Sequence, residues 1–197
     1  MSSQSQDEWG EWQKHGARGM TGGQALAQEI ERVVRAHGIA SPVTTRRGLN
    51  ARLRYLDSPA GRAALREAGA SPRTVRDWYA RRTTPSRASR EKIDTAYWNR
   101  RRENLIRSGQ LKRYFNNEGR GVRMEIYPVD QTAVPEKYRR PNVQDRSIQA
   151  RYVWDDAVDA WKDDDFGTLD EIWDDLIADL DSDWVAYAYV SGIGTSA

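Results

Sequence analysis

Three hydroxyl–proline pairs divide the segment 58–85 of this chain: Ser58-Pro59, Ser71-Pro72 and Thr84-Pro85. A Ser or Thr side chain caps the first turn of a helix, and proline fits that turn because no N–H is needed there. Each pair therefore starts a helix, which must end before the next pair. This restricts the segment to short helices joined by tight turns, the arrangement of a helix-turn-helix domain.

The apolar residues around these pairs follow the period of a helix. They predict one helix from Gln24 to just before Gly38, another that starts near Thr45, and a long helix over 86–107. The three apolar stripes are Leu26, Ile30, Val33 and Val34; Leu49, Leu53 and Leu56; and Ile93, Tyr97, Leu105 and Ile106.

The spacing around the second pair matches the roles needed in a helix-turn-helix. Ala64 is small enough for two helices to cross closely, and Gly69 suits a left-handed turn. Ser71 would cap the recognition helix, while Val75 and Trp78 would pack it against the helices behind. The alternative is an ordinary amphipathic helical hairpin, which can carry the same pattern.

This packing leaves Arg73, Arg76 and Asp77 on the outward face of the helix that would enter the major groove. We predict base contacts from these three residues, since an arginine can donate to both O6 and N7 of guanine. A second set is predicted to contact DNA phosphates. Its members are Ser71, Thr74, Arg81, Arg82, Arg87, Arg101 and Arg102.

Charge separates strongly along the chain, although the net charge is only +2. Residues 44–123 contain 21 Lys and Arg and 7 Asp and Glu, a net charge of +14. Residues 150–197 contain 2 and 13, a net charge of −11. The basic segment indicates an anionic partner, and we expect double-stranded DNA. RNA is the alternative, but the aromatic platforms of single-strand readers are absent.

Two other interpretations of the charge remain open. The basic and acidic segments can form solvated surfaces that attract each other within a dimer or between domains. The acidic face can also cover the basic surface until DNA displaces it, in which case removal of residues 147–197 would tighten non-specific binding.

After the turn cluster at 116–121, the pattern changes to strands and acidic helices. Alternating residues predict strands over 121–130, 147–153 and 183–192, and amphipathic spacing predicts helices over 154–163 and 169–180. Together these make a small α+β domain. Its tryptophans outnumber what so small a core needs, so we expect a homodimer or contact with a replication or conjugation protein. They are Trp154, Trp161, Trp173 and Trp184.

Catalytic and metal chemistry are not expected. The chain has no Cys, and its two histidines, His15 and His37, lie far apart in sequence, so we expect no zinc site. Asp155, Asp159 and Asp163 lack the spacing of a calcium loop and are interpreted as a solvated helix face. No phosphate-binding glycine loop, nucleophile elbow or plausible catalytic triad is present. We expect a binding protein, not an enzyme, with no cofactor and no metal.

The start of the chain does not show the pattern of a signal peptide. The longest apolar run, 184–190, is far shorter than the roughly 20 residues of a membrane helix. We expect a cytoplasmic, nucleoid-associated protein that does not contact membranes.

The stretch GASPRTVRDWYARRTTPS, then a long basic helix, a glycine turn and SIQARYVWDDAVDAW…LDEIWDDLIADL with a closing strand, resembles a known layout. It is similar to helix-turn-helix proteins of actinobacterial mobile elements and linear replicons, in particular the telomere terminal proteins of Streptomyces-type linear DNA. The resemblance covers roughly residues 40–195. It implies a DNA-binding helix-turn-helix and a central threonine hydroxyl linked to a DNA 5′ end. Thr132 lies in that segment with Tyr127 and Tyr138 nearby, and their spacing does not select one.

We therefore predict an α+β protein with a flexible tail (1–22), a mainly helical basic helix-turn-helix domain (23–118) and a small acidic α+β domain (119–197). The leading function is sequence-specific binding of double-stranded DNA by a transcription regulator or maintenance factor of a mobile or linear replicon. Two alternatives are a telomere terminal protein and a DNA-packaging or nucleoid structural protein.

Overall fold

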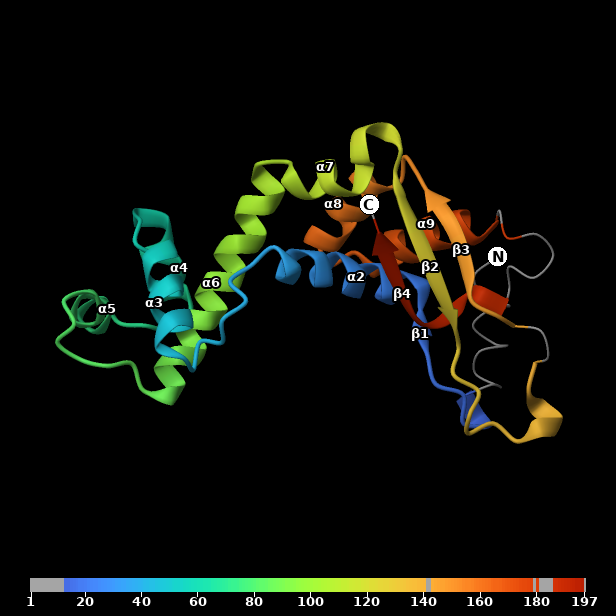
Figure 1. Cartoon of the computed structure of the whole chain (residues 1–197), viewed down its shortest axis with the longest axis horizontal. Coiled ribbons are helices and arrows are strands. Elements are labelled where there is room, and N and C mark those ends of the chain that lie inside the picture. Colours follow the sequence, from blue (N-terminus) through green and yellow to red (C-terminus); the bar gives the residue numbers. More distant parts are fainter. Residues whose placement is uncertain (1–12, 141–142, 179, 181–185, 197) are drawn as a thin grey trace. The chain divides into compact units, whose positions relative to one another are not determined.

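The computed structural model describes residues 13–196 except 141–142, 179 and 181–185 (Figure 1). It contains two compact units. Unit 2 is the continuous segment Arg32–Gln110, and unit 1 consists of the chain before Arg32 and after Gln110. The domain boundaries predicted from the sequence, at 22/23 and 118/119, differ from these limits. The mixed helices and strands confirm the predicted α+β class.

Unit 1 contains a four-stranded antiparallel sheet with the strand order β1-β4-β2-β3. The strands are β1 (Met20–Thr21), β2 (Val122–Pro128), β3 (Arg146–Ala150) and β4 (Tyr189–Ser196). In β2, Met124 lies opposite Ile148 of β3 and Thr195 of β4. Alternate residues of β2 are buried, so one face of the sheet meets the core.

Helices cover the buried face of this sheet. They are the first part of α2 (Gly22–Ala36), α7 (Gln110–Asn116), α8 (Trp154–Lys162) and α9 (Phe166–Ala178), with short 3₁₀ turns at Asn117–Gly119 and Glu136–Tyr138. Phe115 of α7 stacks on Trp154 of α8, with ring centroids 4.2 Å apart. The indole N–H of Trp173 in α9 donates to the carbonyl oxygen of Tyr187 at 2.9 Å. In Figure 1, α9 passes behind β2 and β3.

The prediction of a flexible tail over 1–22 is wrong for residues 13–22, the part that the structure describes. Ala17 is buried, Arg18 forms a backbone bridge with Asp130, and Met20–Thr21 pairs with β4. These residues are held by hydrogen bonds to strands and loops far along the chain, which a local sequence pattern does not show. Residues 1–12 of the predicted tail lie outside the described residues.

The last predicted strand, over 183–192, is also displaced. The strand starts at Tyr189 and continues through two glycines to Ser196. Its pairing with β2 determines this position, because β4 lies between β1 and β2 and is hydrogen-bonded to both. Residues 181–185, including Trp184, lie outside the described residues.

Three of the four tryptophans that suggested a dimer are core residues of unit 1. Trp154, Trp161 and Trp173 are all buried. Their number is therefore explained by packing within the chain, and the homodimer stays a prediction.

Unit 2 contains four helices that begin where the sequence predicts. They are α3 (Arg46–Tyr55), α4 (Pro59–Glu67), α5 (Pro72–Tyr79) and α6 (Arg87–Arg107). The side chains of Thr45, Ser58, Ser71 and Ser86 each accept a hydrogen bond from a backbone N–H in the first turn of their helix. The hydroxyl caps therefore form as predicted, although α6 is capped by Ser86 and not by Thr84.

One hydrophobic core joins these four helices. Ten buried residues form it: Leu49, Leu56, Ala64, Leu65, Ala70, Val75, Trp78, Ile93, Ala96 and Tyr97. The Tyr97 hydroxyl also accepts a hydrogen bond from the N–H of Ile39 at 2.7 Å, which ties the segment before α3 to α6. None of the described helices is both long enough and apolar enough to cross a lipid bilayer.

Candidate nucleic-acid interface

The turn between α4 and α5 is built from a glycine and two hydrogen bonds. Gly69 has φ +83°, the left-handed conformation in which glycine is favoured. The Lys92 ammonium of α6 donates to the carbonyl oxygen of Gly69 at 2.8 Å. Ser71 Oγ accepts from the N–H of Thr74 at 3.2 Å. The Gly69 turn and the Ser71 cap form as the sequence predicts, whereas the Lys92 contact comes from a residue 23 positions away and was not predicted.

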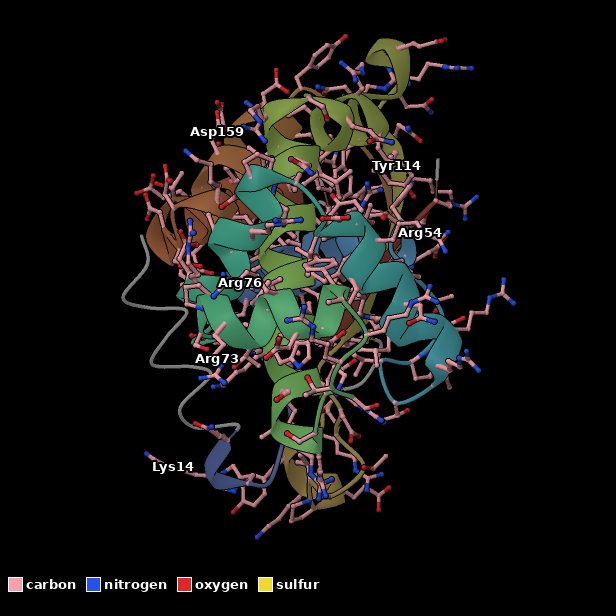
Figure 2. The ribbon with its side chains drawn as sticks, turned by 90° about the vertical axis from the view of Figure 1, so that its left-hand side faces the viewer. Lys14, Arg54, Arg73, Arg76, Tyr114 and Asp159 are labelled. Atoms are coloured by element: carbon pink, nitrogen blue, oxygen red, sulfur yellow. The ribbon has the colours of Figure 1, made fainter. Side chains whose placement is uncertain are left out.

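Packing determines which face of α5 reaches solvent. Val75 and Trp78 are buried in the core of unit 2, and the Tyr79 hydroxyl donates to the carbonyl oxygen of Leu53 at 2.9 Å. Arg73 and Arg76 remain exposed and project from the same side of α5 in Figure 2. The predicted division of this helix into a packed face and an outward arginine face is present.

Asp77, the third residue predicted to contact bases, is less available. Its side chain is only 25% exposed and lies 3.6 Å from the guanidinium of Arg82, one of the predicted phosphate ligands. The two charges partly neutralise each other across the C-terminus of α5. Of the three base-reading candidates, Arg73 and Arg76 are the ones with free side chains.

The predicted phosphate contacts differ in their surroundings. Ser71 and Thr74 share a hydrogen bond between their hydroxyls at 2.8 Å. Arg87 is 96% exposed and lies 3.5 Å from Glu91, while Arg81 is exposed at a residue with φ +55°.

Arg101 and Arg102 are half-buried on α6. Arg101 Nη2 donates to the carbonyl oxygen of His37 at 2.8 Å, and its Nε is buried without a hydrogen-bond partner. Arg101 therefore holds the segment between α2 and α3 against α6. This contact across 64 residues leaves no local sign in the sequence.

The predicted contacts omit four exposed, unpartnered arginines of unit 2: Arg46, Arg47, Arg54 and Arg66. In unit 2, all of whose residues are described, seven exposed arginines have a side chain without a hydrogen bond or ion pair to another residue. They are Arg46, Arg47, Arg54, Arg66, Arg73, Arg76 and Arg81. In Figure 2, Arg54 of α3 lies on the side of unit 2 opposite to Arg73 and Arg76. Their exposed positions on the helices were the signal available in the sequence.

The net charges of the two units differ more than the net charges of the predicted domains do. Unit 2 contains 19 Lys and Arg and 6 Asp and Glu, a net charge of +13. The remaining residues contain 12 and 23, a net charge of −11. A surface this basic attracts anionic polymers at low ionic strength.

The acidic helix face of unit 1 is tied to neighbouring residues. Asp159 of α8 accepts from Lys112 of α7 at 2.7 Å, and Asp155 accepts from the side-chain amide of Asn116 at 2.9 Å. These contacts join α7 to α8 and are consistent with a solvated face.

The hydroxyls considered for attachment to DNA lie in unit 1, in separate surroundings. Tyr127 is in β2, and Tyr138 stacks on the His15 ring with centroids 3.8 Å apart. Thr132 is exposed in a loop, and its N–H donates to the carboxylate of Asp130 at 2.9 Å. Hydrogen bonds from Thr132 hold the pKa of Asp130 below its usual value.

Comparison with known proteins gave no relative: no family model, curated protein or solved structure matches this chain.

Proposed function

We propose that unit 2 binds double-stranded DNA, with α5 in the major groove and Arg73 and Arg76 at base edges. The observation that carries the proposal is the pair of exposed, unpartnered arginines on a helix whose other face is locked in the core. A rigid support of this kind fixes the points from which both arginine side chains leave the helix, and a guanidinium group can make a bidentate contact to guanine.

The charge of unit 2 supports the same function. Contacts with phosphate supply much of the affinity in protein–DNA complexes, and a net charge of +13 on 79 residues favours them. Arg46, Arg47, Arg66 and Arg81 are exposed and available for such contacts, together with Arg87. We propose that these residues position the protein while α5 provides sequence preference.

The test compares two double variants that remove equal charge. A preferred duplex is first selected from a random pool, and binding is then measured by fluorescence anisotropy at several salt concentrations. Arg73→Ala with Arg76→Ala should remove the preference for the selected duplex, at a cost of about 1–3 kcal/mol per base contact.

The matched control is Arg46→Ala with Arg47→Ala, which also removes two exposed, unpartnered arginines. It should weaken selected and random duplexes alike and reduce the salt dependence. If both double variants lower binding to selected and random duplexes by the same factor, α5 does not read sequence and the proposal fails in that respect. If the unmodified protein does not bind duplex DNA at low salt, the whole proposal is wrong.

A further inference from the structure

An open hollow lies between α4 and α5 in unit 2. Its volume is about 650 Å³, and it is lined by Arg62, Arg66, Pro72, Val75, Arg76, Tyr79 and Ala80. Residues four apart share a helix face, so Arg62 and Arg66 form the α4 wall. The α5 wall consists of the residues at i, i+3, i+4, i+7 and i+8 from Pro72. Both walls are parts of regular helices joined by the Gly69 turn, so the hollow is a built feature of the fold.

Three of the lining residues are arginines (Arg62, Arg66 and Arg76), and we call them the rim of the hollow. Arg62 is paired with Asp57 at 2.8 Å, and its guanidinium carbon lies 5.1 Å from the centroid of the Tyr79 ring. Arg66 and Arg76 are exposed and unpartnered, one on each wall. Two guanidinium groups without a carboxylate partner suit a phosphate, which accepts several charge-assisted hydrogen bonds at once.

Four of the lining residues are apolar or aromatic, and we call them the floor of the hollow. They are Pro72, Val75, Tyr79 and Ala80. A free phosphate ion would fill a small part of 650 Å³ and would leave this floor uncovered. A ligand that matches both features has an anionic group for the rim and a flat, mostly apolar group for the floor. The volume lies within the range of about 300–1,000 Å³ found for small-molecule sites.

We propose that this hollow binds a single nucleotide unit, with the phosphate held by Arg66 and Arg76 and the base resting against Tyr79 and its apolar neighbours. Stacking of a base on an aromatic ring or a guanidinium plane tolerates different bases, so the site recognises nucleotides as a class. The nucleotide can be free in solution or can be the end of a DNA strand. The site does not depend on duplex binding by α5.

The first test is calorimetric titration of the full chain with deoxyguanosine 5′-monophosphate, deoxyguanosine and inorganic phosphate. The nucleotide should bind more tightly than either of the other two, because only it uses both rim and floor. Equal affinity for inorganic phosphate and the nucleotide would mean that the arginines bind any anion, and would overturn the proposal. Absence of nucleotide binding would also overturn it.

Variants then locate the site. Arg66→Ala and Arg76→Ala should each weaken nucleotide binding about ten-fold, as expected for loss of one hydrogen-bonded charge. Arg54→Ala removes an exposed, unpartnered arginine of α3 and should have no effect. Ala80→Phe should block the floor while all three arginines remain, so that nucleotide binding is lost. Circular dichroism checks that each variant is folded, and a folded set without these differences contradicts the assignment.

A four-nucleotide strand, with and without a 5′-phosphate, separates the two sources of the ligand. Tighter binding of the phosphorylated strand than of the mononucleotide assigns the hollow to a strand end, and the reverse order assigns it to free nucleotides. Loss of duplex binding with nucleotide binding retained would reject only the function proposed for α5.

Discussion

Arg52 is buried in unit 2 although it is charged, with 4% of its surface exposed. Its guanidinium pairs with Asp94 at 2.5 Å, donates to the carbonyl oxygen of Ser41 at 2.7 Å and lies over the Tyr97 ring. Arg52→Ala would leave Asp94 and a backbone carbonyl without their donor. We expect the free energy of unfolding to fall by about 3–5 kcal/mol, measured by urea denaturation.

Arg54→Ala is the matched control on the same helix, since Arg54 is exposed and unpartnered. It should change stability by no more than about 0.5 kcal/mol. Equal denaturation midpoints for the two variants would show that the Arg52 contacts do not stabilise unit 2.

Tyr79 makes the free energy of unfolding depend on pH. Burial raises the pKa of its hydroxyl from 10.0 to about 12. The folded protein therefore keeps this proton at pH values where the unfolded chain loses it, so the stabilisation is full below pH 10 and is lost as the pH rises towards 12. Tyr79→Phe lacks the group, so the difference in stability between wild type and variant should narrow over this interval. Urea denaturation at a series of pH values tests this, and a constant difference would contradict it.

The α4–α5 turn requires a glycine because of its backbone conformation. There is enough room at this position for a larger side chain. A Cβ at Gly69 would meet the Lys92 side chain at 3.6 Å, an ordinary contact, but φ is +83°. Gly69→Ala should therefore lower the free energy of unfolding by about 1 kcal/mol through backbone strain alone. Gly69→Asn should cost less, because asparagine tolerates this conformation better. Thermal unfolding of both variants is the measurement, and an alanine variant as stable as wild type would refute the argument.

Helices that carry their own start and stop signals were predictable from sequence. The hydroxyl caps and Gly69 define α3, α4 and α5 locally, and these helices form where expected. Strand β4 was misplaced because its limits depend on pairing with β2, about 65 residues earlier in the chain. Met20–Thr21 is too short for any periodicity, and only its pairing with β4 makes it a strand.

For the candidate site too, features set by local spacing were predictable and contacts set by the tertiary fold were not. The outward position of Arg73 and Arg76 follows from the helical spacing of Val75 and Trp78. The pairing of Asp77 with Arg82 and the contact of Arg101 with His37 depend on how the chain folds back on itself. The hollow between α4 and α5 likewise depends on the packing of two helices.

Along the chain, the basic unit 2 is inserted between the two parts of the acidic unit 1. This arrangement determines which truncation can test whether acidic residues cover the basic surface of unit 2. Removal of residues 147–197 would delete β3, α8, α9 and β4, which are most of the sheet and core of unit 1. The loss of that core would obscure any effect of charge. Residues 32–110 contain the complete core around α3–α6 and can be produced as one continuous segment.

We expect the segment 32–110 to unfold cooperatively and to bind duplex DNA. If acidic residues elsewhere in the chain cover its basic surface, it should bind non-specific duplex more tightly than the full chain, because a net charge of −11 has been removed. Anisotropy titrations of both proteins at matched ionic strength measure the difference, and the segment with Arg73→Ala and Arg76→Ala is the control for sequence preference. A folded segment with the affinity of the full chain would show that the acidic residues do not compete with DNA. A folded segment that does not bind would contradict the assignment of DNA binding to unit 2.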